Sequence, residues 1–590
     1  MSRGENAPCR VSRAACLLLA VTFAAGLLHV GFRLREVQVD EAADYGYASV
    51  RQSIRRVQTG GRRGRILDRR GRILADNRVS VSVVCQPACF QRKTWEATAE
   101  EIERAVDRAS SVVGRPSPLS PRTIRRHIRQ SLAMPLFVWR DIDEDELARF
   151  SEHERDLPGF STVSTDERKY PERRLAAHLL GYVGRDRGES QAGDERFNFF
   201  SPELRGRSGL EHYYDSFLRG VAGERKVLVD ARGFAIREWT AVEAQQGPDL
   251  HLTLDIGIQR AVERQLEGVL GACAVIDPRN GEVLALASAP GFDPNDFVPV
   301  LENDLYERYA RDPRKPLLDR ASGGAYAPGS TFKPLVALAG LEAGCSADAT
   351  YCCDGVFVLG QMRLHCSRRW GHGEIDLRHA LMKSCNSFFC NLGMTVGTNA
   401  LVATAKSFGL GEKTGIDSGV DMAGTVPTAE WKQKMYGERW FPGDVAQMSI
   451  GQGMLLVSPL QMARVAGALG TGYLVTPHLK KGVAGERKPL PFSPQHLALV
   501  REGMRMVVAG DGESQGTGWR GGDGVPVAVS GKTGTAEVGR GATRRKNTWF
   551  IAYAPSEAPR IAVAMVIENG DSGGSTTAPR VGKILREVFL

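Results

Sequence analysis

Five apolar, strand-like runs at the two ends of one long C-terminal region constrain the fold most strongly. The first two occupy residues 272–288 and meet at Asn280-Gly281, a strong hairpin signal. The other three, VPVAVSGKTGTAEV, NTWFIAYAP and RIAVAMVIENG, all follow residue 524. Roughly 230 residues of largely helical and loop pattern separate the two sets. We therefore predict an α+β domain in which a five-stranded antiparallel sheet carries a helical insert, with a cleft where the insert meets the sheet.

A single apolar segment near the N-terminus is long enough to cross a membrane. AACLLLAVTFAAGLLHVGF, from Ala14 to Phe32, contains no Asp, Glu, Lys or Arg. Three arginines precede it, a bias that keeps the N-terminus in the cytoplasm. A cleaved signal peptide is the alternative, but the run is long for one and no small-x-small site follows directly. We predict a cytoplasmic tail over residues 1–13, an uncleaved anchor over 14–32, and the rest of the chain outside the cytoplasm.

The region between the anchor and the predicted sheet looks like a scaffold. Short apolar runs alternate there with arginine-rich and glycine-rich turns, and the composition changes near Gln246-Gly247-Pro248. We predict a mixed α/β scaffold over residues 33–247 and the α+β domain over 248–590. Nine arginines and one acid lie between Arg51 and Arg72, in a chain of net charge +9. That stretch is either a solvated basic face or a surface near anionic lipid headgroups or a phosphate-bearing substrate.

A serine and a lysine stand three residues apart in GGAYAPGSTFKPLVALAG, residues 323–340. Pro334 is tolerated only in a helix's first turn, so the helix should begin at about Ser330. Ser330 and Lys333 then share one face, and the hydroxyl lies at the positive end of the helix dipole. Burial among apolar neighbours lowers the pKa of a lysine. A neutral Lys333 could therefore take the proton of Ser330.

Two further short motifs complete a recognisable set. Ser384-Cys385-Asn386 offers a hydroxyl for proton relay and an amide for a substrate carbonyl. Lys532-Thr533-Gly534-Thr535 lies on an apolar strand, where glycine admits a substrate backbone and Lys and Thr can hold a carboxylate. A second Lys-Thr-Gly at residues 413–415 lies between turn residues, so we expect a loop there. The order Ser-x-x-Lys, Ser-x-Asn, Lys-Thr-Gly is typical of penicillin-binding proteins and class A β-lactamases.

The chain resembles the class B penicillin-binding proteins, and most closely penicillin-binding protein 2 of the elongation machinery. The segments that carry the resemblance are GRILDRRGRILA, AAHLLGYVGR, GRSGLEHYYDSFLRG, AVIDPRNGEVLALAS, APGSTFKP, GHGEIDLRHALMKSC, SIGQG and SGKTGTAEV. The run PTAEWKQKMYGERWFPGD favours the elongation type over the division type. The resemblance implies a transmembrane helix, an elongated pedestal and a transpeptidase domain similar to serine β-lactamases.

The activity that the resemblance implies is D,D-transpeptidation, which cross-links peptidoglycan stem peptides during cell elongation and shape maintenance. The implied catalytic set is Ser330 as nucleophile, Lys333 as base, Ser384 as proton relay, Asn386 as donor-binding amide and Lys532 as carboxylate-binding cation. The implied substrate-binding set is Thr533, Gly534 and Thr535. The backbone N–H groups of Ser330 and Thr535 would form the oxyanion hole.

The resemblance also implies partners and a location. The partners are stem peptides ending in D-Ala-D-Ala, β-lactams, a SEDS-type glycosyltransferase, elongation-complex proteins and the membrane, with no nucleic acid. The chain would be a single-pass inner-membrane protein with its catalytic domain in the periplasm, and acyl transfer would need no cofactor. The alternatives are a division-type transpeptidase, a D,D-carboxypeptidase, a serine β-lactamase, or a non-catalytic scaffold that activates a glycosyltransferase.

A cluster of cysteines surrounds the second motif. Cys353, Cys366, His372 and Cys385 are spaced 13, 6 and 13 residues apart. Three thiolates and an imidazole make a closed tetrahedral zinc set with a structural role. The resemblance supports zinc, because some elongation-type relatives bind it at matching positions, partly through aspartates. A disulfide outside the cytoplasm and unrelated buried thiols are the alternatives, and Cys352 competes with Cys353 as a ligand.

Overall fold

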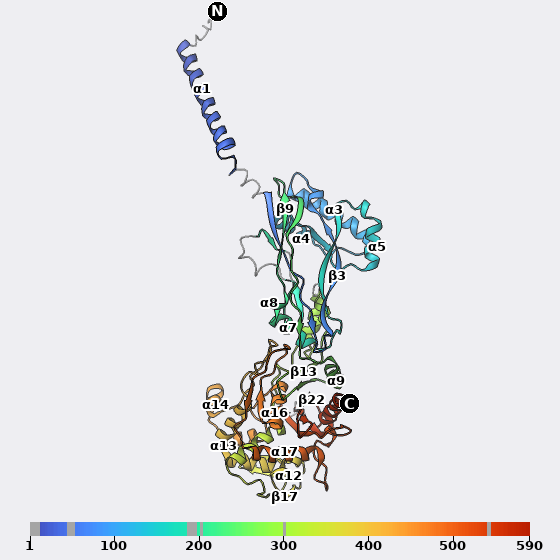
Figure 1. The fold of residues 1–590 in the computed structure, drawn as a ribbon, viewed down its shortest axis with the longest axis vertical. Coiled ribbons are helices and arrows are strands. Elements are labelled where there is room, and N and C mark those ends of the chain that lie inside the picture. The colour runs from blue at the N-terminus through green and yellow to red at the C-terminus, as the bar shows by residue number, and fades with distance from the viewer. Residues whose placement is uncertain (1–11, 44–52, 186–196, 201–203, 299–302, 540–543) are drawn as a thin grey trace, which may run out of the picture.

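The computed structural model is an elongated molecule in which a long helix, a pedestal and a catalytic domain follow one another along the chain (Figure 1). It describes residues 12–43, 53–185, 197–200, 204–298, 303–539 and 544–590. The C-terminus lies at the side of the catalytic domain, near β22 (Ile561–Glu568) and α9 (Ile256–Leu266), and the far end of the molecule lies at β17 (Gly373–Ile375).

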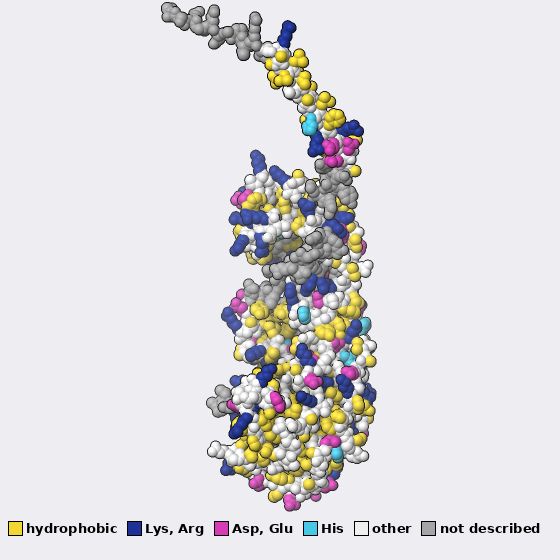
Figure 2. Space-filling model, turned by 90° about the vertical axis from the view of Figure 1, so that its left-hand side faces the viewer, with side chains coloured by type: hydrophobic (Ala, Val, Ile, Leu, Met, Phe, Trp, Pro, Cys, Tyr) yellow, Lys and Arg dark blue, Asp and Glu magenta, His cyan; other side chains and the backbone are white. Residues whose placement is uncertain are grey.

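The N-terminal helix α1 runs from Arg13 to Arg35 and none of its residues is buried. Its 23 residues span about 35 Å, slightly more than the hydrocarbon core of a bilayer. The helix carries a mean hydropathy of 2.1 over its most apolar window. Figure 2 shows its surface covered by hydrophobic side chains, with Lys and Arg at its ends. The segment predicted as an anchor, residues 14–32, therefore lies wholly within one exposed apolar helix.

The described pedestal is built from two larger sheets and the small two-stranded sheet β6-β8, with helices packed against one of the larger sheets. The first sheet has the order β10-β9-β1-β7, and the second has the order β11-β2-β3-β4 with β5 also paired to β3. The strands are β1 Ile54–Thr59, β2 Ile66–Leu67, β3 Ile73–Cys85, β4 Leu136–Trp139, β5 Phe160–Lys169, β6 Val183–Arg185, β7 Phe199–Phe200, β8 Leu204–Gly206, β9 Gly223–Val229, β10 Ala235–Val242 and β11 Leu250–His251. The helices are α3 Trp95–Val113, α4 Pro121–Ser131, α5 Glu144–Glu152, α6 Ala177–Leu180, α7 Gly209–Tyr213 and α8 Asp215–Leu218.

Most described arginines of the basic stretch form ion pairs, and several of their side chains stay exposed, from 41% for Arg56 and Arg72 to 71% for Arg70. The two interpretations of this stretch as a surface therefore stay predictions. Arg63 is buried and reaches Glu211 at 2.6 Å and Asp215 at 2.8 Å. Further pairs join Arg56 to Glu224, Arg62 to Asp166, Arg65 to Asp249, Arg69 to Glu282, Arg70 to Asp255, and Arg72 to Asp68 and Asp255. Most of these acids lie about 100 or more residues farther along the chain, so the stretch links distant segments of the molecule. Arg51 lies outside the described residues.

A buried ionic network holds the lower pedestal together. Glu211 has no exposed surface, and it accepts hydrogen bonds from Arg63 at 2.6 Å and from Arg168 at 2.7 Å. Burial alone would raise the pKa of Glu211, but the charges of Arg168 and Arg63 hold that pKa below its usual value. Removing one member would leave an uncompensated buried charge, which costs about 3–5 kcal/mol of folding stability.

The predicted five-stranded antiparallel sheet is present in the catalytic domain. Its order is β13-β12-β22-β21-β20, and every neighbouring pair is antiparallel. The strands are β12 Gly271–Ile276, β13 Val283–Ala289, β20 Ser530–Val538, β21 Arg545–Ala554 and β22 Ile561–Glu568. The two early strands form the expected hairpin, and the three late strands complete the sheet. Strand β20 lies at one edge, beside the helical insert.

Both faces of this sheet are buried. Alternate residues of β22 point to opposite faces: Ala562, Ala564 and Val566 join the core shared with the insert, while Val563 and Met565 join a second core. Helices α9 Ile256–Leu266 and α18 Ala578–Phe589 cover the second face, and α16 Pro459–Thr471 covers the first. Burial on both faces explains why these strands read as continuous apolar runs.

The insert is largely helical, as expected, with small two-stranded sheets. Its helices are α10 Asn303–Arg311, α11 Lys333–Glu342, α12 Leu377–Lys383, α13 Asn386–Ser407, α14 Ala429–Tyr436, α15 Pro442–Ser449, α16 and α17 Pro494–Ala509. Its strands are β14 Tyr351–Cys353, β15 Val356–Leu359, β16 Met362–His365, β17 Gly373–Ile375, β18 Tyr473–Val475 and β19 Arg487–Pro489. Residues 413–415 lie in a loop, which confirms the prediction for the second Lys-Thr-Gly.

Candidate active site

Ser330 lies on a short 3-10 turn, Gly329–Phe332, that leads directly into α11. Pro334 occupies the first turn of α11, as the sequence predicted, because a proline farther along would break the helix. Gly329 has a φ of +56°, and a Cβ there would meet the carbonyl oxygen of Thr535 at 2.8 Å. Only glycine allows this approach, which brings the backbone before Ser330 against strand β20.

Lys333 is fully buried, and its amine faces the second motif rather than solvent. Its Nζ donates to the carbonyl oxygen of Ser384 at 2.8 Å and to Oδ1 of Asn386 at 2.7 Å, and it lies 3.4 Å from the hydroxyl of Ser384. Burial lowers the pKa of Lys333 to about 8. Among the described contacts, none is a hydrogen bond from this amine to Ser330. The two groups nevertheless lie one helical turn apart, on the same side of the segment.

The second motif lies between two helices. Ser384 ends α12 in the left-handed conformation, with φ 55° and ψ 44°, and the side chain of Cys385 caps α13. Such a conformation is unusual for a residue other than glycine and is often found at functional sites. The amide of Asn386 donates to the carbonyl of His365 at 2.7 Å. Because a carbonyl only accepts hydrogen bonds, the atom of Asn386 that faces His365 is the amide nitrogen, and Oδ1 therefore faces Lys333.

The third motif lies on edge strand β20. Lys532 is fully buried, and its Nζ donates to the hydroxyl of Ser384 at 2.9 Å and to the carbonyl of Thr533 at 3.1 Å. Burial, and then the neighbouring charge of Lys333, lower the pKa of Lys532 well below its usual value. The hydroxyl of Ser384 therefore lies between two buried amines. The three motifs that are far apart in the sequence converge on one site.

Comparisons with known proteins agree with this arrangement. A penicillin-binding protein transpeptidase domain matches residues 271–586, and a penicillin-binding protein dimerisation domain matches residues 58–252. The peptidoglycan D,D-transpeptidase MrdA of Escherichia coli (strain K12) is 31% identical over 98% of this chain and 93% of its own length. The chain belongs to the class B penicillin-binding proteins of the PBP2 type.

Solved structures of PBP2-type proteins share the fold. The complex of PBP2 with MreC from Helicobacter pylori matches with a TM-score of 0.78 and 28% identity, over 91% of this chain and 99% of that chain. A structure titled "Structural coordination of polymerization and crosslinking by a peptidoglycan synthase complex" matches with a TM-score of 0.71 and 28% identity, over 98% and 99% of the two chains.

This PBP2-type chain is therefore a peptidoglycan D,D-transpeptidase of the elongation type. The match spans the pedestal and the catalytic domain, and so it favours a transpeptidase over a carboxypeptidase or a β-lactamase. Penicillin binding and a peptidoglycan substrate agree with the family, and α1 is compatible with a single-pass membrane anchor.

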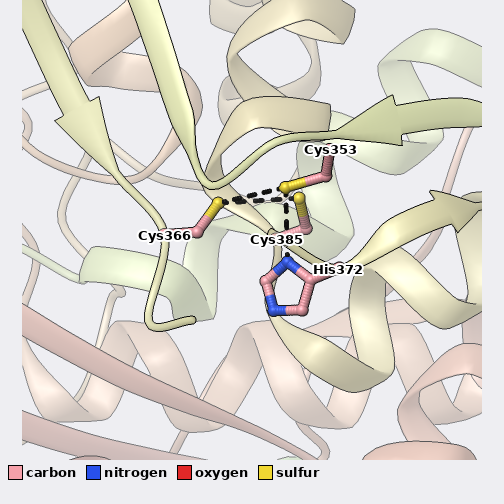
Figure 3. A group of neighbouring side chains, drawn as sticks. All are labelled: Cys353, Cys366, His372 and Cys385. Carbon is pink, nitrogen blue, oxygen red and sulfur yellow. Dashed lines mark hydrogen bonds between the residues drawn. The ribbon is translucent and has the colours of Figure 1, made fainter. Parts of the chain in front are cut away.

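The cysteine cluster forms a compact tetrad in this PBP2-type site (Figure 3). The ligand atoms of Cys353, Cys366, His372 and Cys385 all lie within 4.8 Å of one another. Cys366 Sγ lies 3.7 Å from Sγ of both Cys353 and Cys385, and Nδ1 of His372 lies 3.4 Å from Cys353 Sγ. A tetrahedral zinc ion with ordinary bond lengths separates its sulfur ligands by about 3.8 Å and a sulfur from a nitrogen by about 3.6 Å. The tetrad therefore fits zinc closely.

The surroundings of the tetrad suit thiolates. The backbone N–H of Ser387 donates to Sγ of Cys366 at 3.4 Å, and that of Phe388 donates to Sγ of Cys385 at 3.4 Å. All ten cysteines of the described residues are free in this structure. Alternation along β14 exposes Cys352 and buries Cys353, which selects Cys353 for the tetrad.

The structure adds two neighbours of the third motif that sequence reasoning missed. Thr517, in the segment between α17 and β20, lies within hydrogen-bonding distance of Thr533. The backbone N–H of Gly573, which follows β22, donates to the hydroxyl of Thr535 at 3.3 Å. Neither residue belongs to a recognisable motif, so tertiary contact is the only signal that identifies them.

Proposed function

We propose that Ser330 is the nucleophile of the D,D-transpeptidase reaction and that neutral Lys333 is its base. The Ser330 hydroxyl attacks the carbonyl carbon between the two terminal D-alanines, and its proton passes to Nζ of Lys333. The tetrahedral intermediate collapses as the C–N bond breaks, and the leaving D-alanine amine takes a proton through Ser384. An acceptor amine then attacks the ester carbonyl and loses a proton to Nζ of Lys333. The ester C–O bond breaks, the amide cross-link forms, and that proton passes from Lys333 to the Ser330 oxygen to restore the hydroxyl.

The hydrogen bonds of Lys333 carry this proposal. A carbonyl and an amide oxygen accept hydrogen bonds only, so they use two N–H groups of the amine. A neutral amine has two N–H groups and one lone pair. Lys532 donates to the Ser384 hydroxyl, which can then point its own proton at that lone pair. This arrangement supports Ser384 as the proton relay. It also requires the amine of Lys333 to turn toward Ser330 when substrate binds. Such a change is common, because catalytic hydrogen bonds often tighten only in the enzyme–substrate complex.

The remaining motif residues would hold the substrate. Lys532 and Thr533 would bind the terminal carboxylate, Asn386 would bind the donor peptide, and Gly534 would let the donor backbone approach β20. The N–H groups of Ser330 and Thr535 would stabilise the oxyanion, an effect worth about 3–4 kcal/mol per donor in other acyl-transfer enzymes. The contact between Gly329 and Thr535 supports this pairing, because it draws the two backbones together.

The rate of acylation should depend on pH through Lys333, which tests the proposed base. Lys333 must be unprotonated to accept a proton, and its pKa is about 8. We expect the second-order rate of penicillin acylation to rise about tenfold per pH unit below pH 8 and to level off above it. Stopped-flow measurements between pH 6 and pH 10 would follow this. A flat or falling profile over that range, with an unchanged circular dichroism spectrum, would exclude Lys333 as the base.

We propose that the tetrad of Cys353, Cys366, His372 and Cys385 holds a structural zinc ion. Four protein ligands leave no open position for water, so the ion would contribute stability and no chemistry. Cys385 immediately follows Ser384 and precedes Asn386, so the metal would fix the loop that carries both side chains. The sulfur separations and the backbone N–H groups that face the sulfurs support the proposal.

Replacing Cys385 by alanine should remove the metal and weaken catalysis together. We expect about one zinc per chain in the purified protein, less than about 0.1 in Cys385→Ala, and acylation slowed by about tenfold to a hundredfold. Elemental analysis and penicillin acylation measure the two effects. Cys352→Ala is the matched control, because Cys352 is the exposed neighbour of a ligand. Full zinc content in Cys385→Ala would refute this assignment.

We propose that α1 anchors the chain with its N-terminus in the cytoplasm and its catalytic domain in the periplasm. The arginines before the apolar segment support this orientation. We also propose that the pedestal serves assembly with a glycan-polymerising SEDS-type glycosyltransferase and with an MreC-like protein. The similar structures of a peptidoglycan synthase complex and of a PBP2–MreC complex support these partners.

A further inference from the structure

Thr517 links two of the active-site motifs through a short chain of hydrogen bonds. Its hydroxyl accepts a hydrogen bond from the hydroxyl of Thr533 at 3.0 Å. The same hydroxyl donates to the carbonyl of Met382 at 3.1 Å, and the Thr517 N–H reaches that carbonyl at 3.4 Å. Met382 lies in the last turn of α12, two residues before Ser384. Thr517 therefore joins the Ser-x-Asn helix to the Lys-Thr-Gly strand.

The direction of the protons in this chain is fixed by the carbonyl. A carbonyl oxygen accepts hydrogen bonds only, and carbonyls in the last turn of a helix need partners from outside it. The single hydroxyl proton of Thr517 must therefore point at Met382. The hydroxyl of Thr533 must then donate to Thr517, so its own single proton is already engaged.

The backbone that carries Thr517 has little room to shift. A Cβ on Gly516 would meet the carbonyl oxygen of Val507 at 2.2 Å, and one on Gly518 would meet the ring of Phe550 at 2.8 Å. The N–H of Gly518 also donates to the carbonyl of Val507 at 2.9 Å. Close packing on both sides holds the Thr517 hydroxyl against Thr533.

We propose that Thr517 is a positioning residue that sets the affinity for the donor's terminal carboxylate. A carboxylate accepts hydrogen bonds only, so it can bind the Thr533 hydroxyl only by taking the proton that Thr533 gives to Thr517. Binding therefore replaces an existing hydrogen bond and does not simply add one. The proposal rests on the proposed role of Thr533 in holding the carboxylate, and it assigns to Thr517 an effect on binding and none on the acyl-transfer step.

Removing the competing acceptor should tighten the binding of acids alone. In Thr517→Val the hydroxyl proton of Thr533 no longer has an acceptor in residue 517, so a carboxylate can take it without breaking that bond. A neutral hydrogen bond of ordinary strength corresponds to a change in affinity of about threefold to tenfold. We expect the dissociation constant of benzylpenicillin to fall by that factor, while the acylation rate constant at saturation stays unchanged. Benzylpenicillin methyl ester, which lacks the carboxylate charge, should bind the variant and the unmodified protein equally. Thr517→Ser keeps the acceptor oxygen and should restore the original constants.

Saturation kinetics of acylation with the acid and the ester decide the matter. Equal shifts for acid and ester in Thr517→Val, a changed saturating rate, or unchanged affinity for the acid would each overturn the proposal. If Thr517→Val does not fold, Thr517→Ala must show the same selective gain. Thr533→Val tests the carboxylate-binding role of Thr533 separately from the positioning role of Thr517. If Thr533→Val loses affinity for the acid only, the role of Thr533 is supported. The absence of a selective gain in Thr517→Val would then count against Thr517 alone. Equal losses for acid and ester in Thr533→Val would refute both.

Discussion

Ser330→Ala is expected to form no covalent adduct with penicillin and to release no D-alanine from a D-Ala-D-Ala donor. The hydroxyl oxygen is the atom that bonds to the substrate carbonyl. The neighbouring hydroxyl of Thr331 is fully buried and donates to the carbonyl of Pro328 at 2.7 Å, so we do not expect it to replace Ser330. Loss of the nucleophile in a comparable serine enzyme lowers turnover by about 10⁶-fold, so residual activity should fall below detection. Fluorescent-penicillin labelling and D-alanine release measure the two reactions directly.

The fold of Ser330→Ala should be unaffected, which makes the loss interpretable. Ser330 is only partly buried, and the described contacts include no hydrogen bond to its hydroxyl. We expect a melting temperature within about 2 °C of the unmodified protein, as for substitutions that remove no packing or buried hydrogen bond. Ser575→Ala, which removes an exposed hydroxyl from the turn after β22, is the control and should retain labelling. Labelling of Ser330→Ala above about one per cent of the unmodified protein would favour another nucleophile. Normal peptidoglycan cross-linking by the Ser330→Ala protein would favour the non-catalytic scaffold.

Lys333→Met should slow acylation by about a thousandfold, the second-largest effect expected. Methionine nearly matches the length of lysine but cannot accept a proton, and general-base catalysis contributes about 10²- to 10⁴-fold. The fold should persist, because the change replaces a fully buried amine by an apolar side chain. The rise of the rate toward pH 8 should disappear as well, since the titrating group is gone.

The second Lys-Thr-Gly supplies a matched control for that variant. Lys413 is exposed and lies in a loop, so Lys413→Met should leave both the acylation rate and its pH profile unchanged. Stopped-flow acylation of the two variants side by side distinguishes a specific base from a general effect of lost positive charge. An acylation rate for Lys333→Met within tenfold of the unmodified protein would remove Lys333 from the mechanism.

The catalytic sheet and the nucleophile helix could be predicted because their signals are local. Asn280-Gly281 marks a hairpin, the late apolar runs mark buried strands, and Pro334 fixes where a helix can begin. The convergence of Ser330, Ser384 and Lys532 followed from the order of the motifs. The hydrogen bonds among these side chains could not be predicted from the sequence, because the orientation of a buried amine depends on residues from three separate segments.

Features that depend on distant partners could not be read from the sequence. The arginines between Arg51 and Arg72 suggested a basic surface, but acids such as Glu211 and Glu224 pair with them from about 150 residues away. The choice between Cys352 and Cys353 needed the register of β14, which turns one side chain outward and the other inward. Thr517 carried no signal, since a threonine between glycines is typical of many turns.

The most direct test of the central claim is to locate the bond that penicillin forms. The purified chain would be treated with benzylpenicillin, weighed intact by mass spectrometry, digested and mapped. One adduct per chain, with the full mass of the antibiotic and attached to Ser330, is the expected result. An adduct on Ser384 or any other residue, or a chain that gains no mass, would contradict the assignment of the nucleophile.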